Sequence, residues 1–196
     1  MASSLAVDGL LGEIREATHR VSELIGAVRS YSQLDRALVQ QTEVTEGLES
    51  TLVMLGHKLR GGITVVRDYA PDLPRVEAIP GELNQVWTNL IDNAVDAMEG
   101  SGRLWLTVRA AESGDGVASG VVVEVADDGP GVTEDVAAHA FEPFFTTKEV
   151  GKGTGLGLDI SRRIIVERHG GEISLEARPG GGALVRVRVP LRAAEG

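Results

Sequence analysis

The sequence contains no cysteine and no long hydrophobic run, and each absence excludes a class of protein. Without cysteine the chain can form neither disulfides nor thiolate metal sites, which suits a reducing cytoplasm. No apolar stretch approaches the roughly 20 residues that cross a bilayer, and the N-terminus lacks the apolar core of a signal peptide. We therefore expect a cytoplasmic protein with no membrane segment in this chain.

Positive charge is also scarce, because 19 lysines and arginines face 29 acidic residues, for a net charge of −10. A protein that binds nucleic acid would need a basic face, so polynucleotide partners are not expected. A phosphate ligand would have to be held by backbone amides, a metal ion and a few local cations. The 196 residues suffice for one well-buried domain, or for a domain plus an appendage.

The first 40 residues show the spacing of a coiled-coil seam, with apolar residues in alternating steps of four and three. The seam consists of Leu10, Ile14, Ala17, Val21, Leu24, Val28 and Tyr31. A helix of about 30 residues would be roughly 45 Å long, which is more than a compact domain needs. We expect residues 1–40 to form a docking or dimerising helix, with a long helix packed on the domain's own core as the alternative.

The remaining residues predict an α+β fold, a two-layer α/β sandwich that occupies residues 41–192 as one domain. Helices are expected at 45–60, capped by Thr45, at 85–98 and at 158–168. Strands are expected at 63–69, 103–110, 120–126, 172–177 and 183–191. Because helices come early and strands mostly late, we expect a mixed or antiparallel sheet with helices on one face.

The helix expected at 85–98 carries the first motif with a chemical meaning. Gln85, Asn89, Asn93 and Asp96 step by four, four and three, so they share one helical face. The carboxamide oxygen of Asn93 can ligate Mg²⁺, a hard cation that takes few protein oxygens. Asn89 stands where a hydrolytic relative of such a pocket would carry a glutamate base. Since an amide cannot accept a proton from water, Asn89 favours phosphoryl transfer over hydrolysis.

A second motif, Asp127-Asp-Gly129-Pro-Gly131, directly follows a strand rich in valine. A carboxylate at a strand end can accept a hydrogen bond from an adenine amine when glycines allow the backbone to approach the ring. Asp127 is the candidate for this contact. The alternative is an ordinary Asp-Gly turn.

Two further motifs follow, one rich in phenylalanine and one in glycine. All three phenylalanines fall within residues 141–145, where Pro143 and polar neighbours predict a loop over a pocket. Lys148 ends this segment and offers a positive charge to a phosphate. The run 151–158 presents backbone amides to anions as it leads into a helix. It is not a P-loop, because no Gly-Lys-Ser/Thr ending follows.

In order and spacing, the four motifs resemble the N, first glycine, F and second glycine boxes of the GHKL superfamily. They are most similar to the catalytic and ATP-binding domain of sensor histidine kinases. The resemblance covers about residues 43–191, including the terminal hairpin that begins near His169. It implies the Bergerat ATP-binding fold, ATP and Mg²⁺ as cofactors, a histidine as the phosphoryl acceptor and a response regulator as partner.

The resemblance also implies roles for the motif residues. The catalytic side chains would be Asn89, Asn93 and Lys148. Asn93 would bind Mg²⁺, and Asn89 would lie beside the phosphates. Asp127 would contact adenine, and residues 132–154 would form a mobile lid. The residues expected to bind the nucleotide are Asn89, Asn93, Asp96, Asp127, Gly129, Gly131, Phe145, Thr146, Lys148, Gly153, Thr154, Gly155, Leu156, Gly157 and Leu158.

Residues 1–40 resemble the second helix of the family's dimerisation and phosphoacceptor hairpin, so a homodimer through this helix is expected in the full-length protein. His19 is followed by Arg20 rather than by an acidic residue, lacks a nearby proline and lies off the apolar seam. We therefore expect His19 to be a solvated helix residue and the acceptor histidine to lie upstream or on a partner. Structural roles are expected for the other three histidines, His57, His139 and His169.

Three other functions remain open. An ATPase of the gyrase or MutL kind resembles the same fold, and Asp92 or Asp96 would then have to replace the missing glutamate. A nucleotide-sensing interaction module would use the first 40 residues to pair and the pocket only to sense. A serine kinase that acts on a regulatory protein, as in anti-sigma-factor kinases, fits the long first helix less well.

Overall fold

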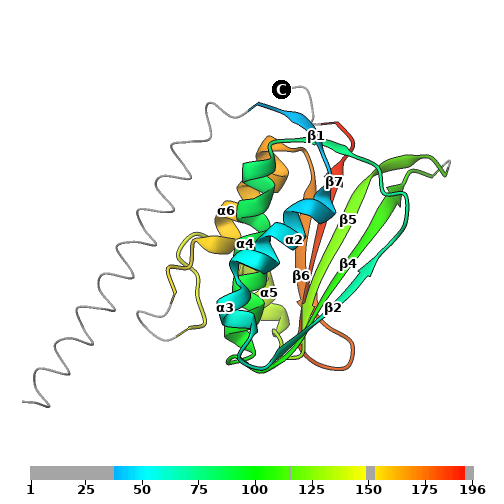
Figure 1. Ribbon diagram of the computed structural model, residues 1–196. Coiled ribbons are helices and arrows are strands. Elements are labelled where there is room, and N and C mark those ends of the chain that lie inside the picture. Colours follow the sequence, from blue (N-terminus) through cyan, green and yellow to red (C-terminus); the bar gives the residue numbers. More distant parts are fainter. Residues whose placement is uncertain (1–37, 115, 149–152, 193–196) are drawn as a thin grey trace, which may run out of the picture.

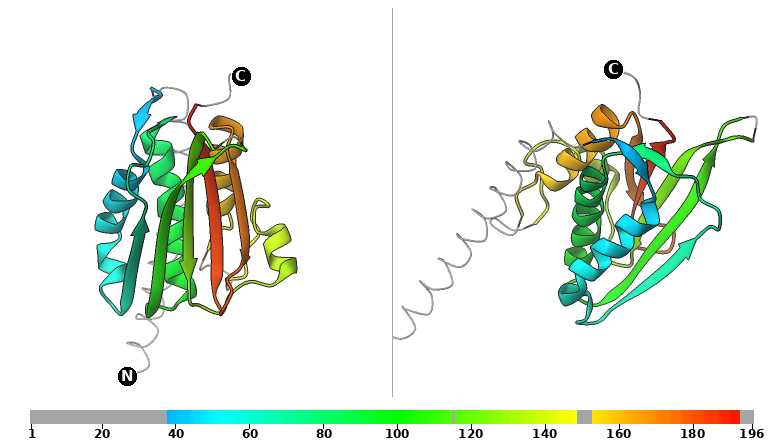
Figure 2. Two further views of the ribbon diagram at one scale, coloured as in Figure 1. Left: turned by 90° about the vertical axis from the view of Figure 1, so that its right-hand side faces the viewer. Right: turned by 45° about the horizontal axis from the view of Figure 1, so that its top comes forward.

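The computed structural model describes residues 38–114, 116–148 and 153–192. They form two layers, in which the helices cover one face of a five-stranded sheet (Figure 1 and Figure 2). The expected α+β sandwich is thereby confirmed. The long N-terminal helix and His19 lie outside the described residues. Within the described ranges, no helix combines the length and the apolar character that a membrane crossing requires.

The helices and strands agree in order with the expectation, and three short elements are added to it. The helices are α2 (Val44–Met54), α3 (Gly56–Leu59), α4 (Pro80–Ala97), α5 (Glu134–His139), α6 (Gly157–Arg162) and the π-helical η1 (Arg163–Arg168). The strands are β1 (Gln40–Thr42), β2 (Ile63–Tyr69), β3 (Val76–Ala78), β4 (Gly102–Glu112), β5 (Ala118–Asp127), β6 (Glu172–Ala177) and β7 (Ala183–Pro190). The additions are β1, β3 and α5.

The main sheet is mixed, with the strand order β2-β4-β5-β7-β6. Strands β2 and β4 run parallel, while the other three neighbouring pairs are antiparallel. A parallel pair needs a crossover connection, and here α4 supplies it on the helical face. Strands β1 and β3 form a separate antiparallel pair. The amide of Glu77 in β3 donates to the Leu191 carbonyl at 2.8 Å, which ties this pair to the end of β7.

The core lies between α4 and the inner face of the sheet. The apolar side of α4 is buried, as its spacing predicts, and each large side chain there contributes about 1.5–3 kcal/mol by leaving water. Its buried residues include Leu83, Val86, Trp87, Leu90, Ile91 and Ala94. Helix α2 crosses α4 closely at Gly47, where a Cβ atom would come within 2.6 Å of Asn84 Oδ1. The polar side of α4 is therefore left facing the loops.

The expected helix at 45–60 is wrong in two details. Glu43, not Thr45, is the N-cap residue, and Thr45 lies in the first turn with its hydroxyl 3.2 Å from Glu43 Oε1. The helix is also interrupted at Leu55, which separates α2 from α3. Leu55 is buried, so the break keeps both short helices packed on the core.

The helix expected at 158–168 changes from α to π geometry at Arg163. Two consecutive residues of the π-helical part, Ile164 and Ile165, are both buried. His169 closes this turn, with Nδ1 at 2.9 Å from the Ile164 carbonyl and Nε2 accepting from the Ile79 amide at 3.2 Å. The structural role expected for His169 is therefore confirmed.

Candidate nucleotide-binding site

The polar face of α4 is joined through Asn89 to the second glycine-rich segment, of which the structure describes residues 153–158. Asn89 Nδ2 donates to the Gly157 carbonyl oxygen at 2.9 Å and to Ser161 Oγ at 3.2 Å. Gln85 Nε2 donates to Asn89 Oδ1 at 3.0 Å. Ser161 is fully buried, and its hydroxyl donates to the same Gly157 carbonyl at 2.8 Å. Both polar atoms of the Asn89 carboxamide thus contact protein groups, and the contacts of Nδ2 hold α4 against the first turn of α6.

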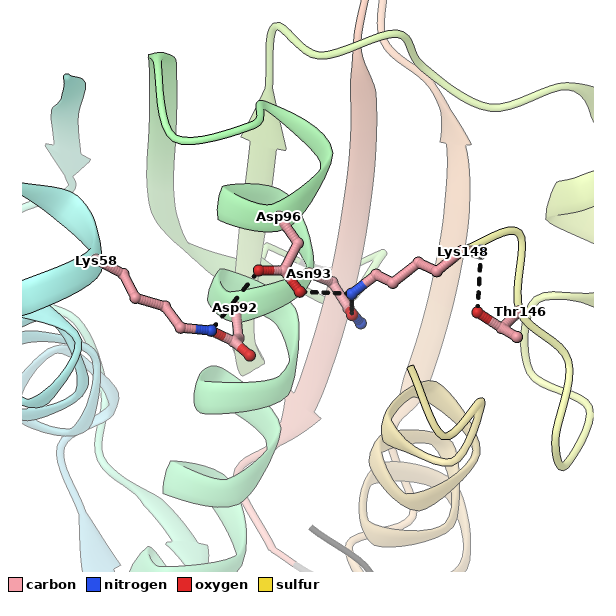
Figure 3. Close-up of polar contacts among 6 residues, drawn as sticks. All are labelled: Lys58, Asp92, Asn93, Asp96, Thr146 and Lys148. Carbon is pink, nitrogen blue, oxygen red and sulfur yellow. Dashed lines mark hydrogen bonds and ion pairs between the residues drawn. The ribbon is translucent and has the colours of Figure 1, made fainter. Parts of the chain in front are cut away.

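One turn later, Asn93 and Asp96 meet the lysine of the phenylalanine-rich segment (Figure 3). Lys148 Nζ lies 2.6 Å from Asp96 Oδ2 and 3.4 Å from Asn93 Oδ1. Lys58 of α3 approaches from the other side, with Nζ at 2.5 Å from Asp92 Oδ1 and 3.6 Å from Asp96 Oδ1. The two carboxylates that flank Asn93 are therefore both ion-paired with lysines.

These groups fit a magnesium ion that is carried by a nucleotide better than a resident metal. The Asn93 amide oxygen is a hard donor that already contacts a cationic group, the Lys148 ammonium. Among the described residues, no group of three or more histidine, aspartate or glutamate side chains could hold a metal ion. Most ligands of such a Mg²⁺ would have to be phosphate oxygens and water.

A third turn of α4, at Ala97, meets the first glycine-rich segment, residues 127–131. A Cβ atom at Gly129 would come within 3.2 Å of the Ala97 carbonyl oxygen, so glycine allows this close approach. Asp127 is buried beside it, and its Oδ1 accepts from the amides of Gly129 at 2.9 Å and Ala183 at 3.2 Å. Burial raises the pKa of Asp127, although these two hydrogen bonds act in the opposite direction. Within the part of the chain that the structure describes, no hydrogen bond reaches Oδ2.

The phenylalanine-rich segment is a surface loop, as its composition predicts. Phe144 is 73% exposed, and its left-handed backbone has a φ of 67°. Its amide donates to the Gly155 carbonyl at 2.9 Å, and the Phe144 backbone leaves no space for a side chain at Gly155. Phe145 is half-buried, with its ring centroid 6.0 Å from that of His139. The loop is thus fixed to the second glycine-rich segment.

The other residues expected at the nucleotide lie in the phenylalanine-rich segment, in the two glycine-rich segments or at the start of α6. Thr146 Oγ1 accepts from the Lys148 amide at 3.1 Å, and Thr154 Oγ1 accepts from the Leu156 amide at 3.4 Å. Leu158 packs against the hydrophobic core. The remaining two are Gly131, which has a φ of 82°, and Gly153, where a Cβ atom would lie 3.1 Å from Lys148 Cδ.

Taken together, Asn89, Asn93 and Ala97 mark successive turns of α4, and each of these turns contacts a different motif. Segments far apart in the sequence are gathered along one helical face. This face offers the Asn93 amide, a lysine and glycine-rich backbone, which suit a ligand that combines a planar ring with phosphates.

A separate hollow of about 480 Å³ lies between α5 and β6. Its lining includes Val132, Thr133, Leu175 and the two carboxylates Glu134 and Glu176, but none of the residues expected at the nucleotide. Unlike the polar face of α4, where Lys58 and Lys148 pair with the carboxylates, the described residues that line this hollow offer no lysine or arginine to a phosphate.

The fold and the gathered motifs define an ATP-binding α/β sandwich. Residues 78–193 match the family described as histidine kinase-, DNA gyrase B- and HSP90-like ATPases. The chain belongs to this family, and the resemblance inferred from the four motifs is confirmed.

Its relatives are sensor kinases. The chain is 30% identical to sporulation kinase E of Bacillus subtilis over an alignment of 174 residues. This alignment covers 88% of this chain and 22% of that protein. The catalytic domain of the histidine kinase ThkA superposes with a TM-score of 0.70 at 32% identity, over 79% of this chain and 97% of that one. ThkA in complex with the response regulator protein TrrA gives a TM-score of 0.73 at 26% identity, over 91% of this chain and 50% of that one. The chain thus spans about a fifth of the length of the curated relative.

Two residues of the site were not predicted, Lys58 and Ser161. Lysine occurs only three times in this acidic chain, which was a signal that each lysine could serve a local anionic group. Ser161 gave no such signal, because a serine inside an expected helix is ordinary. Its contact with Asn89 depends on how α6 packs against α4.

Proposed function

We propose that this chain is the catalytic ATP-binding region of a two-component sensor histidine kinase. It would transfer the γ-phosphoryl group of Mg-ATP to a histidine that lies upstream or on a partner. The observation that carries the proposal is the arrangement along α4, where Asn89 contacts Gly157 and Asn93 contacts Lys148. Residues 41–192 would be the catalytic domain, and residues 1–40 would belong to the dimerisation helix.

The phosphates would lie beside Asn93 and Lys148. Bound Mg²⁺ would neutralise part of the charge that the phosphate oxygens carry during transfer. Asn93 would offer Oδ1 as its protein ligand. Lys148 would add a second positive charge, because its ammonium group already lies at this oxygen. The glycine-rich backbone around Gly155 and Gly157 would supply amide donors.

The adenine would lie at the other end of the site, beside Asp127. Two backbone amides fix Oδ1 of this carboxylate, so Oδ2 is oriented to accept a hydrogen bond from the adenine amine. Gly129 and Gly131 carry no side chain that would keep the ring away. The remaining nucleotide-binding residues named from the sequence would line the loops between these two ends.

Transfer to a protein is favoured over hydrolysis because α4 offers no free carboxylate next to Asn93. Asn89 cannot take a proton from water, and both of its polar atoms contact protein groups. Asp92 and Asp96, which could have replaced a glutamate base, are both paired with lysines. This supports a kinase over the ATPase alternative.

The proposed kinase function implies two protein partners, a response regulator and a second copy of the chain. A response regulator would receive the phosphoryl group from the histidine, as the complex of ThkA with TrrA suggests by analogy. The helix in residues 1–40 would bring two copies together in the full-length protein. We place the activity in the cytoplasm, where ATP and response regulators are available.

A phosphoryl-transfer assay tests this function. The chain is incubated with γ-labelled ATP, Mg²⁺ and a separately supplied helical hairpin that contains an acceptor histidine. We expect label on the hairpin that is lost in acid and kept in base, as a phosphohistidine requires. The Asn93→Ala variant serves as the control and should transfer no label. Brisk release of phosphate without any hairpin would instead favour the ATPase.

A further inference from the structure

The proposed phosphate site contains two carboxylates that work against it. Asp92 and Asp96 flank Asn93 and lie one turn apart on α4 (Figure 3). Like charges four residues apart on a helix repel each other. Both would also repel a triphosphate, in a chain whose net charge is already −10. A site for phosphates therefore requires a group that compensates these charges.

Lys58 supplies this compensation from a different element. Its neighbour Leu59 is buried in the core, which fixes the short helix α3 beside α4. The ammonium group of Lys58 lies 2.5 Å from Asp92 Oδ1 and 3.6 Å from Asp96 Oδ1. Burial alone would lower the pKa of Lys58, but its ion pairs with Asp92 and Asp96 outweigh this effect and raise the pKa. Lys58 therefore stays charged at neutral pH.

Asp96 connects Lys58 with the lysine proposed to meet the phosphates. Its Oδ1 faces Lys58 at 3.6 Å, and its Oδ2 faces Lys148 at 2.6 Å. The Asp96 carboxylate is thus shared between Lys58 and Lys148. In the absence of Lys58, Asp96 would pair with Lys148 only. Without Lys58, the two aspartates would leave excess negative charge beside Asn93 and would bind Lys148 more strongly.

We propose that Lys58 is a positioning residue of the nucleotide site, which neutralises Asp92 and Asp96 so that Asn93 and Lys148 can receive a metal-bound triphosphate. This inference rests on the proposed function, because it assumes that Mg-ATP binds along α4. It adds a residue from outside the four motifs. It also gives α3, which connects α2 to β2, a direct electrostatic link to the phosphate end of the site.

The affinity of the chain for Mg-ATP, measured by isothermal titration calorimetry at low salt, tests this role. Lys58→Met removes the charge and keeps most of the aliphatic chain, and we expect it to weaken binding by about threefold to fivefold. Lys58→Arg keeps the charge and should bind nearly as the parent chain does. Arg67→Met is the matched control, because it removes an ion pair of similar exposure, with Glu49 at 2.8 Å, away from the site.

A rescue experiment separates this electrostatic role from a merely structural one. Adding Asp92→Asn to Lys58→Met removes the uncompensated negative charge and should restore most of the affinity. Asp92→Asn alone should tighten Mg-ATP binding, since Lys58 is then left with less negative charge to neutralise. The loss caused by Lys58→Met should also shrink as salt is raised. Thermal melting of each variant checks that the fold is retained.

The role of Lys58 is refuted if Lys58→Met binds Mg-ATP like the parent, or if Arg67→Met loses as much affinity. Should Lys58→Met not fold, Asp92→Asn decides alone, and weaker or unchanged binding by that variant overturns the proposal. Failure of the proposed function has a different signature. Either the parent chain binds no Mg-ATP, or Asn93→Ala binds it equally well, and both results overturn the role of Lys58 as well.

Discussion

The Asn89 side chain donates a hydrogen bond to the carbonyl oxygen of Gly157 at 2.9 Å, although the two residues lie 68 positions apart in the sequence. Sequence reasoning placed Asn89 beside the phosphates. In the structure its amide nitrogen faces the start of α6 and its oxygen accepts from Gln85. Asn89 therefore holds the second glycine-rich segment against α4, and its contribution to nucleotide binding would be made through that segment.

Removing this connection should destabilise the fold. Asn89→Ala loses the donors to Gly157 and Ser161 and leaves Gln85 without its acceptor. We expect the free energy of unfolding to fall by about 1–3 kcal/mol, measured by urea denaturation. Ser161→Ala, which removes one partner of the same amide, should cost less. An unchanged free energy of unfolding in Asn89→Ala would contradict the role assigned to this contact.

Two glycines of the β6–β7 turn should respond differently to the same substitution. Gly180 and Gly182 have nearly equal φ angles of 92° and 93°. A Cβ atom at Gly180 meets nothing within 4 Å, whereas at Gly182 it would collide with the backbone carbonyl of Asp127. Gly180→Ala therefore carries only backbone strain, of about 1–2 kcal/mol.

Gly182→Ala carries the same strain and the collision as well. We expect it to lower the free energy of unfolding by at least about 1–3 kcal/mol more than Gly180→Ala. Thermal and urea denaturation of both variants measure the difference. Equal losses would show that the turn can move away from Asp127, and that the close packing around this carboxylate is not required.

Glu49 of α2 should make the free energy of unfolding depend on pH. Its Oε1 accepts from Arg67 Nε at 2.8 Å and from the Tyr69 hydroxyl at 2.9 Å. The hydrogen bond with Arg67 lowers the pKa of Glu49, against the opposing effect of burial. Because the folded-state pKa is depressed, this stabilisation is present above the unfolded-state pKa and is lost as pH falls through the folded-state value.

Glu49→Gln should therefore be less stable than the parent at pH 7, by up to about 1 kcal/mol for a half-exposed pair. The difference should shrink progressively once the pH falls below the ordinary pKa of a glutamate, about 4.3. Glu112→Gln, an exposed position at the end of β4, is the control and should show no such convergence. A difference between Glu49→Gln and the parent that does not shrink as the pH is lowered would exclude the ion pair as its source.

Much of the fold follows from local pattern, and the exceptions have physical causes. Strands β2 and β4 to β7 and helix α4 were predictable because each carries a run of alternating or helically spaced apolar residues. Strands β1 and β3 contain three residues each, too few for a period to show. The π turn that begins at Arg163 was not predictable, since two consecutive buried residues such as Ile164 and Ile165 also occur in ordinary α-helices, as Leu90 and Ile91 do in α4.

For the candidate site, the sequence indicated Asn93, Asp127 and Lys148 because each stands within a recognisable motif. For Lys58 the scarcity of lysine was the one signal, and the sequence could not show its partner, because the contact with Asp92 spans 34 positions and depends on the packing of α3 beside α4. Motifs thus named the side chains expected to face a ligand. The groups that hold those side chains in place became visible only in the folded structure.

The assignment of Asp127 to the adenine amine predicts a change in base preference. Asp127→Asn keeps an oxygen for the amides of Gly129 and Ala183, so the fold should be retained. Its new amide group would face the adenine amine with a second donor, and we expect affinity for ATP to fall by about tenfold to a hundredfold. Inosine triphosphate carries a carbonyl where ATP carries the amine, so its affinity should fall less or rise.

Calorimetric titration of both nucleotides into both proteins measures this preference. Asp128→Asn is the matched control, because it makes the same change at the next residue, an exposed carboxylate whose Oδ1 accepts from the Arg103 amide at 2.7 Å. That contact survives in the amide, so the ratio of the two affinities should stay as in the parent chain. If Asp127→Asn weakens ATP and inosine triphosphate equally, Asp127 supports the shape of the site and does not read the base.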